Sequence, residues 1–198
     1  MKHVCSSFLL LLFVSAGLSQ KLSTYSDSLG AFRNDYINTH EVVTAKEDRG
    51  LLRFFPIDPS YQVKCRFEKI FDAPWFPVAT TTASPQMMRK YGYLSFTFHD
   101  TAVHIYVYQM QALLQKLGDY LFLPFTDLTT GTDTYGGGRY VDCNISDIHD
   151  STLIVDFNKA YNPYCAYVSG YSCPIPPKEN AMPIAIRSGE KNYGRSPH

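Results

Sequence analysis

The chain has 198 residues, of which 45% are hydrophobic, and this size and composition fit one globular domain. Its 18 basic and 18 acidic residues give a formal net charge of zero. A nucleic-acid-binding protein normally carries a basic stripe, and an anionic lipid surface attracts a polybasic segment. Because the sequence contains neither, we expect no nucleic-acid partner and no lipid-surface partner.

The N-terminus has the organisation of a secretory signal peptide. A short basic start precedes an apolar run over residues 8–14, and small residues follow this run. The order predicts a signal peptide over residues 1–19, with cleavage after Ser19 or after Ala16. The apolar run is shorter than the ~20 residues that span a bilayer, so we expect no stable membrane insertion after cleavage. The sequence thus predicts a periplasmic or secreted protein with a single β-rich domain over residues 20–198.

Cleavage of this signal peptide would leave four cysteines: Cys65, Cys143, Cys165 and Cys173. An oxidising compartment favours disulfides, and four cysteines allow three pairings. We favour the pair Cys165–Cys173, because Gly170 and other turn-forming residues lie between the two thiols. The spacing of the cysteines and histidines matches no zinc site, and we expect neither a metal nor a cofactor.

Apolar residues three or four positions apart predict an amphipathic helix over residues 23–40. After this helix the pattern changes to strands. The clearest pair flanks His99-Asp100-Thr101 and predicts a β-hairpin. Residues 110–117 fit either a short helix or a continuation of the second hairpin strand, and residues 126–138 fit a structured loop. Strands are predicted over residues 51–55, 61–67, 91–98, 102–108, 119–125, a segment ending at 155–157, and 184–187.

One helix followed by about seven strands, with no alternation of strands and helices, is typical of a mainly β (α+β) protein. We expect an antiparallel β-barrel or sandwich, with the N-terminal amphipathic helix packed against it.

A glycine-rich corner is the first candidate site. Gly136, Gly137 and Gly138 let the backbone approach a ligand closely, and Arg139 follows at once beside Tyr135. The guanidinium suits a carboxylate or phosphate, which predicts an anion-binding corner. The structural alternative is a glycine-rich bend that leads into a strand, with Arg139 paired to an internal carboxylate.

A second candidate site follows the predicted strand that ends at 155–157. Asp156 and Asn158 would share one strand face, and Tyr161 and Asn162 follow at a turn. These polar side chains either line a ligand pocket or cap their own turn.

Three carboxylates are candidates for catalysis by general acid and base chemistry: Asp127, Asp156 and Glu179. The alternative is that they form ion pairs with Arg139 or Arg187.

Three segments together resemble a known family: Thr134–Tyr140, Asp156–Tyr167 and Cys173–Asn180. Their order and spacing are similar to domain-of-unknown-function family 1684, most strongly over residues 125–193. The chain resembles the short form that carries a signal peptide, similar to proteins of Bacteroidetes-type bacteria. The family brings no agreed activity, so the resemblance implies a fold without a reaction.

The sequence leaves three functional hypotheses open. The first is an exported module that binds a small polar or anionic ligand between the glycine-rich corner and the turn at residues 156–162. The second is a hydrolase that depends on carboxylates or on a metal. In the third, the motifs only build the fold around a buried arginine–carboxylate network.

Overall fold

A computed structural model describes residues 5–195, and the side chains of residues 1–19, 21 and 22 lie outside the described part. The side chains of the predicted signal peptide therefore fall outside it, together with residues 1–4. The chain divides into two compact units, residues 1–39 and residues 40–198.

The first unit is helix α1, Cys5–Thr39. It confirms the helix predicted over residues 23–40, although the helix begins earlier than expected. None of the described helices has the length and apolar character that a membrane crossing needs. The expected packing of α1 against the sheet stays a prediction.

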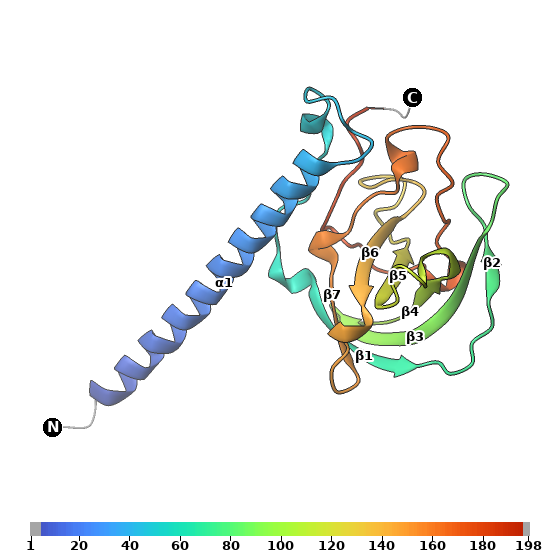
Figure 1. Cartoon of the computed structure of the whole chain (residues 1–198). Coiled ribbons are helices and arrows are strands. Elements are labelled where there is room, and N and C mark those ends of the chain that lie inside the picture. Colours follow the sequence, from blue (N-terminus) through green and yellow to red (C-terminus); the bar gives the residue numbers. More distant parts are fainter. Residues whose placement is uncertain (1–4, 196–198) are drawn as a thin grey trace. The chain divides into compact units, whose positions relative to one another are not determined.

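The second unit contains one antiparallel sheet of seven strands in the described chain. The strand order is β6-β5-β4-β3-β1-β7, and β2 pairs with β3. The sheet curls into a half-barrel (Figure 1), which confirms the mainly β antiparallel fold with one N-terminal helix. The strands are β1 Gln62–Lys69, β2 Phe76–Val78, β3 Gln86–Phe98, β4 Thr101–Met110, β5 Tyr120–Phe125, β6 Arg139–Asn144 and β7 Thr152–Asp156.

Strands β3 and β4 form the predicted hairpin. His99 and Asp100 occupy its two-residue turn with φ values of 42° and 64°. Positive φ at both central positions is the type I′ geometry, whose twist matches that of the flanking strands. Asp tolerates this conformation because its short side chain can bond locally.

The sheet buries apolar side chains on both faces, which explains why β5 has almost no exposed residue. Val63, Cys65 and Phe67 alternate with exposed residues along β1, as predicted, and point into the main core. Leu121 and Leu123 of β5 join that core. The opposite face carries a second cluster with many aromatic rings: Val78, Met88, Tyr108, Phe122 and Tyr140.

Two predicted strands are wrong. Residues 51–55 contain the end of a short 3-10 helix and a single bridge from Phe54 to Glu190. Residues 184–187 have no regular structure. Ile186 makes its backbone hydrogen bonds to the side chains of Asp127 and Arg139 instead of to a neighbouring strand. This segment has the apolar composition of a strand, but side chains take the place of a neighbouring strand as hydrogen-bond partners of Ile186.

The link after β4 settles the open alternative for residues 110–117: the strand ends at Met110 and a 3-10 helix follows. The 3-10 helices cover Arg49–Leu51, Pro59–Tyr61, Gln111–Leu113, Ile145–Asp147, Phe157–Lys159, Tyr164–Ala166 and Lys178–Asn180.

Candidate functional site

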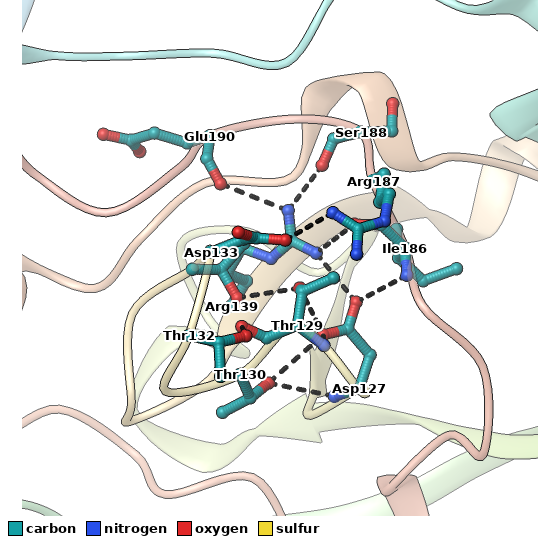
Figure 2. A network of polar contacts seen from close by, with 11 residues as sticks. Asp127, Thr129, Thr130, Thr132, Asp133, Arg139, Ile186, Arg187, Ser188 and Glu190 are labelled. Carbon is teal, nitrogen blue, oxygen red and sulfur yellow. Dashed lines mark hydrogen bonds and ion pairs between the residues drawn. The ribbon is translucent and has the colours of Figure 1, made fainter.

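Arg139, the first residue of β6, lies inside the protein with only 1% of its surface exposed. Its Nη2 donates to Asp127 Oδ2 at 2.9 Å and to the Ile186 carbonyl at 2.8 Å. Its Nη1 donates to the carbonyls of Ser188 and Glu190 (Figure 2). Of the three guanidinium nitrogens of Arg139, only Nε has no hydrogen-bond partner among the described residues. The guanidinium therefore joins β6 to the C-terminal segment.

Asp127 organises the other side of this network. Its Oδ1 accepts from the Thr129 backbone at 2.9 Å and from the Thr129 hydroxyl at 2.6 Å. Its Oδ2 accepts from the Ile186 backbone at 2.9 Å as well as from Arg139. Burial lowers the pKa of Arg139, and the charges of Asp127 and Glu190 oppose this effect. The charge of the predicted anion-binding arginine is thus used within the protein.

The glycine-rich corner is close to its own chain. Gly138 has a φ of 83°, and a Cβ there would lie 2.6 Å from the Phe125 carbonyl and 2.7 Å from Pro176. A Cβ on Gly137 would meet the ring of Tyr135 at 2.4 Å. Gly136, in contrast, has room for a side chain, since its nearest neighbour is 3.8 Å away. Gly137 and Gly138 therefore allow a close approach to atoms of the protein itself.

The polar residues of the turn after β7 are also bonded to protein backbone. Asn158 accepts from the Asp58 N–H at 3.0 Å and donates to the Asp58 carbonyl at 2.8 Å. Asp156 Oδ1 accepts from the Asn158 backbone at 3.0 Å. Asn162 donates its side-chain amide to the Lys191 carbonyl and its backbone N–H to Glu190.

The glycine-rich corner and this turn nevertheless lie side by side. The backbones of Tyr140 and Tyr161 exchange two hydrogen bonds, of 2.9 and 3.0 Å. Glu190 joins both segments, because its carbonyl accepts from Arg139 and its carboxylate accepts from Asn162 and from the Tyr167 hydroxyl. The segments that the sequence singled out therefore meet in space.

Glu179 lies apart, on the 3-10 helix Lys178–Asn180. Its carboxylate pairs with Lys90 Nζ at 2.9 Å and lies 3.5 Å from the Tyr108 hydroxyl. Burial alone would raise the pKa of Glu179, but the hydrogen bond and the charge of Lys90 outweigh it and lower the pKa. Glu179 is thus an ionised ion-pair partner at neutral pH.

A cavity of about 270 Å³ opens on the aromatic face of the sheet. We call it the tyrosine pocket. Strands β4, β5 and β6 supply one side of it, and the chain from the turn after β7 to the prolines after Cys173 supplies the other. Of the predicted site residues, Tyr161 and Cys173 line it. The lining residues are Met110, Phe122, Tyr140, Tyr161, Pro163, Tyr164, Tyr171, Ser172, Cys173 and Pro174.

The disulfide Cys165–Cys173 closes the loop that forms one wall of the tyrosine pocket, and it confirms the favoured pairing. Cys65 and Cys143 are free and buried. Thr81 holds the same loop from outside, because its hydroxyl donates to the Tyr171 carbonyl at 2.8 Å and accepts from the Cys173 N–H at 3.1 Å.

A carboxylate that the sequence did not single out lies beside the pocket. Asp142 pairs with Phe122 in the register of β6 and β5, and its Oδ1 accepts from the hydroxyls of Tyr120 and Tyr161, each at 2.7 Å. No described residue donates to its Oδ2. Across the pocket, the Tyr164 hydroxyl donates to Glu41 at 2.5 Å.

These groups have perturbed pKa values. Burial raises the pKa of Tyr164 to about 12, helped by the hydrogen bond to Glu41. Burial also raises the pKa of Tyr161 well above its ordinary value, and the charge of Asp142 adds to this. Water reaches the Asp142 side chain, but protein surrounds it closely. This desolvation raises its pKa, and the two tyrosine hydroxyls oppose the rise.

A larger cavity, of about 550 Å³, lies beside Glu179. Its polar side chains include Lys90 and Glu179, which neutralise each other. Phe71 on its rim is 80% exposed. In the part of the chain that the structure describes, no three His, Cys, Asp or Glu side chains are grouped as metal ligands.

The family model for a protein of unknown function, DUF1684, matches residues 50–191. The chain belongs to this family. α1 lies outside the matched range. The DUF1684 chain is also similar to an uncharacterized protein from gene locus rrnAC0354 of Haloarcula marismortui, whose structure was solved by solution NMR. The two are 27% identical, with a TM-score of 0.66, over 87% of this chain and 96% of that one. Comparison with curated proteins gave no significant match.

Sequence reasoning found Tyr161 and Cys173 but missed the rest of the pocket and Asp142. A signal was present in the alternation along β6. Tyr140 and Asp142 alternate with Val141 and Cys143 on β6, so a period of two places the first pair on one face.

Proposed function

We propose that this DUF1684 protein is an exported module that binds a small polar ligand in the tyrosine pocket. One observation carries the proposal: a concave aromatic site, held by a disulfide, lies beside a carboxylate that has one oxygen to which no described residue donates. Ligand sites are typically concave and mostly apolar, with a few placed polar groups. The volume of about 270 Å³ suits a small ligand or the head group of a larger one.

The contacts of Arg139 move the proposed site away from the glycine-rich corner. Its side chain is 1% exposed, and its two terminal nitrogens donate to four protein acceptors. A ligand at the corner would have to displace these contacts. We assign Arg139 and Asp127 a supporting role, in which they hold the segment around Glu190 against the pocket wall.

Hydrolysis has less support than binding. A carboxylate-dependent hydrolase needs two acidic side chains that face one substrate with separated pKa values. Asp127 is paired with Arg139 in the interior, and Glu179 is paired with Lys90 beside the other cavity. Asp156 caps the turn at Asn158.

A screen of small molecules tests the pocket. Sugars, amino acids, organic cations and carboxylic acids are each added to the wild type, to Tyr171→Ala and to Phe71→Ala, and thermal shifts and NMR titrations are recorded. Tyr171 is 42% exposed and lines the tyrosine pocket, whereas Phe71 lines the other cavity. We expect one class to bind the wild type and Phe71→Ala equally and Tyr171→Ala about tenfold more weakly. Binding to no class contradicts the proposal, and a loss confined to Phe71→Ala assigns the site to the other cavity.

Export is tested separately, because it rests on the N-terminal sequence alone. Expression in a bacterial host is followed by fractionation and mass spectrometry of the N-terminus. We expect mature protein outside the cytoplasm, beginning at Gln20 or at Gly17. Uncleaved protein confined to the cytoplasm would contradict export and leave the binding proposal standing.

A further inference from the structure

The charged side chains that hydrogen-bond to the lining tyrosines of the tyrosine pocket are carboxylates. None of the lining residues is Lys, Arg or His. Two of the lining tyrosines donate their hydroxyls to carboxylates: Tyr161 to Asp142 at 2.7 Å and Tyr164 to Glu41 at 2.5 Å. An anionic ligand would find no opposite charge on these walls, and a cation would find two carboxylates behind them.

The pocket also has few free hydrogen-bond donors. The hydroxyls of Tyr161 and Tyr164 are engaged as described, and the Tyr140 hydroxyl donates to the Pro174 carbonyl at 2.5 Å. The Ser172 hydroxyl bonds to Thr80 at 2.8 Å. Of the lining hydroxyls, only that of Tyr171 has no hydrogen-bond partner among the described residues. Anions and sugar oxygens need several donors, and this pocket offers them one free hydroxyl. A cation needs only acceptors and ring faces.

The rings form walls that face in several directions. Tyr140 meets Tyr161 at an interplanar angle of 86° and Phe122 at 66°, and Tyr164 meets Tyr171 at 73°. A slot between two parallel rings would suit a flat aromatic ligand. Rings set at steep angles instead enclose a rounded group, as in the aromatic cages that bind substituted ammonium ions.

The carboxylates act on the rings as well as on the ligand. A phenol that donates a hydrogen bond to an anion gains electron density on its ring, which strengthens its attraction for a cation on the ring face. Tyr161 has this arrangement through Asp142, and Tyr164 has it through Glu41. The free Oδ2 of Asp142 adds direct Coulomb attraction.

We infer that the tyrosine pocket binds an organic cation, a small molecule or head group that carries a substituted ammonium. The inference rests on the proposed function, since it names the ligand class of the same pocket. The aromatic walls would surround the methyl or methylene groups of the cation, while Asp142 and Glu41 balance its charge.

The test compares choline with 3,3-dimethylbutan-1-ol, which has the same shape but no charge. Both are titrated into the purified chain while tyrosine ring resonances are followed by NMR. We expect choline to bind at least tenfold more tightly than the neutral alcohol. The variant Asp142→Asn keeps an acceptor for both tyrosine hydroxyls but loses the charge, and we expect it to bind choline about tenfold more weakly. Glu41→Gln provides a second, independent charge removal, with a smaller loss expected.

Asp72→Asn is the matched control, because Asp72 is an exposed carboxylate beside the other cavity. Its affinity for choline should equal that of the wild type. Equal binding of choline and the neutral alcohol would overturn the inference and leave the pocket proposal intact. The same holds if choline fails to bind while another class in the screen binds in a way that depends on Tyr171. If no class binds at all, the pocket proposal itself fails.

Discussion

The Arg139 network and the tyrosine pocket contain similar chemical groups but treat them in opposite ways. In the network, a guanidinium that is 1% exposed donates four hydrogen bonds, to one carboxylate oxygen and three backbone carbonyls (Figure 2). Beside the pocket, Asp142 is reachable by water, and no described residue donates to one of its two carboxylate oxygens.

The difference between the two regions shows which charged groups can still bind a ligand. A charge whose partners all belong to the protein stabilises the fold or its specificity, and it has little left to offer a ligand. A charge that is held in place by hydroxyls on one side and left open on the other is oriented but still available. Perturbed titration in a concave place is typical of functional groups.

The largest expected effect tests the structural side of this comparison. Arg139→Met leaves Asp127 as an unpaired buried charge, and we expect the free energy of unfolding to fall by about 3–5 kcal/mol in urea denaturation. The control is Arg187→Met, whose ion pair with Asp133 is exposed on both sides, so its loss should be below about 1 kcal/mol. If Arg139→Met is as stable as the wild type but no longer binds ligand, Arg139 contacts the ligand and the anion-binding hypothesis for it is supported.

The second effect concerns the wall that separates the pocket from solvent. The double variant Cys165→Ser/Cys173→Ser loses the cross-link, and we expect unfolding free energy to fall by roughly 2–3 kcal/mol because the unfolded chain is less constrained. Ligand affinity should fall too, since this loop carries Tyr171 into the pocket.

A reducing agent should reproduce this loss in the wild type and leave the double variant unchanged, because Cys65 and Cys143 are already free. Full affinity without the disulfide would show that Thr81 alone holds the wall.

The smallest expected effect is a gain in stability, in contrast to the losses above, and it separates a functional role of Asp142 from a structural one. The folded state holds the pKa of Asp142 above its ordinary value, so ionisation costs stability as pH rises from the ordinary carboxyl pKa through the raised one. Below that window the cost is absent. Asp142→Asn should therefore be slightly more stable than the wild type at neutral pH and equally stable in acid, while binding choline more weakly. Thermal unfolding at several pH values measures this, and a destabilised Asp142→Asn at neutral pH would make Asp142 a structural residue.

Short-range chemistry made several features predictable from the sequence. The β3–β4 hairpin follows from alternating residues around His99 and Asp100, which form a tight turn. The pairing Cys165–Cys173 follows from a short segment that contains Gly170. The alternation along β1 follows from the two-residue period of a strand. In each case the deciding partners lie within a few residues of one another or repeat along one element.

Long-range contacts decided the rest. The sequence by itself determined a mainly β fold with an N-terminal helix, because strand periods and turn residues act locally. Only the tertiary structure decided that Arg139 faces Asp127 and Ile186 instead of a ligand. The same is true of the backbone of Ile186, which bonds to side chains instead of to a strand, and of the contact between Asp142 and Tyr161. Such pairings depend on which distant segments the curled sheet brings together, and residue type alone does not choose among the acceptors available to a buried charge.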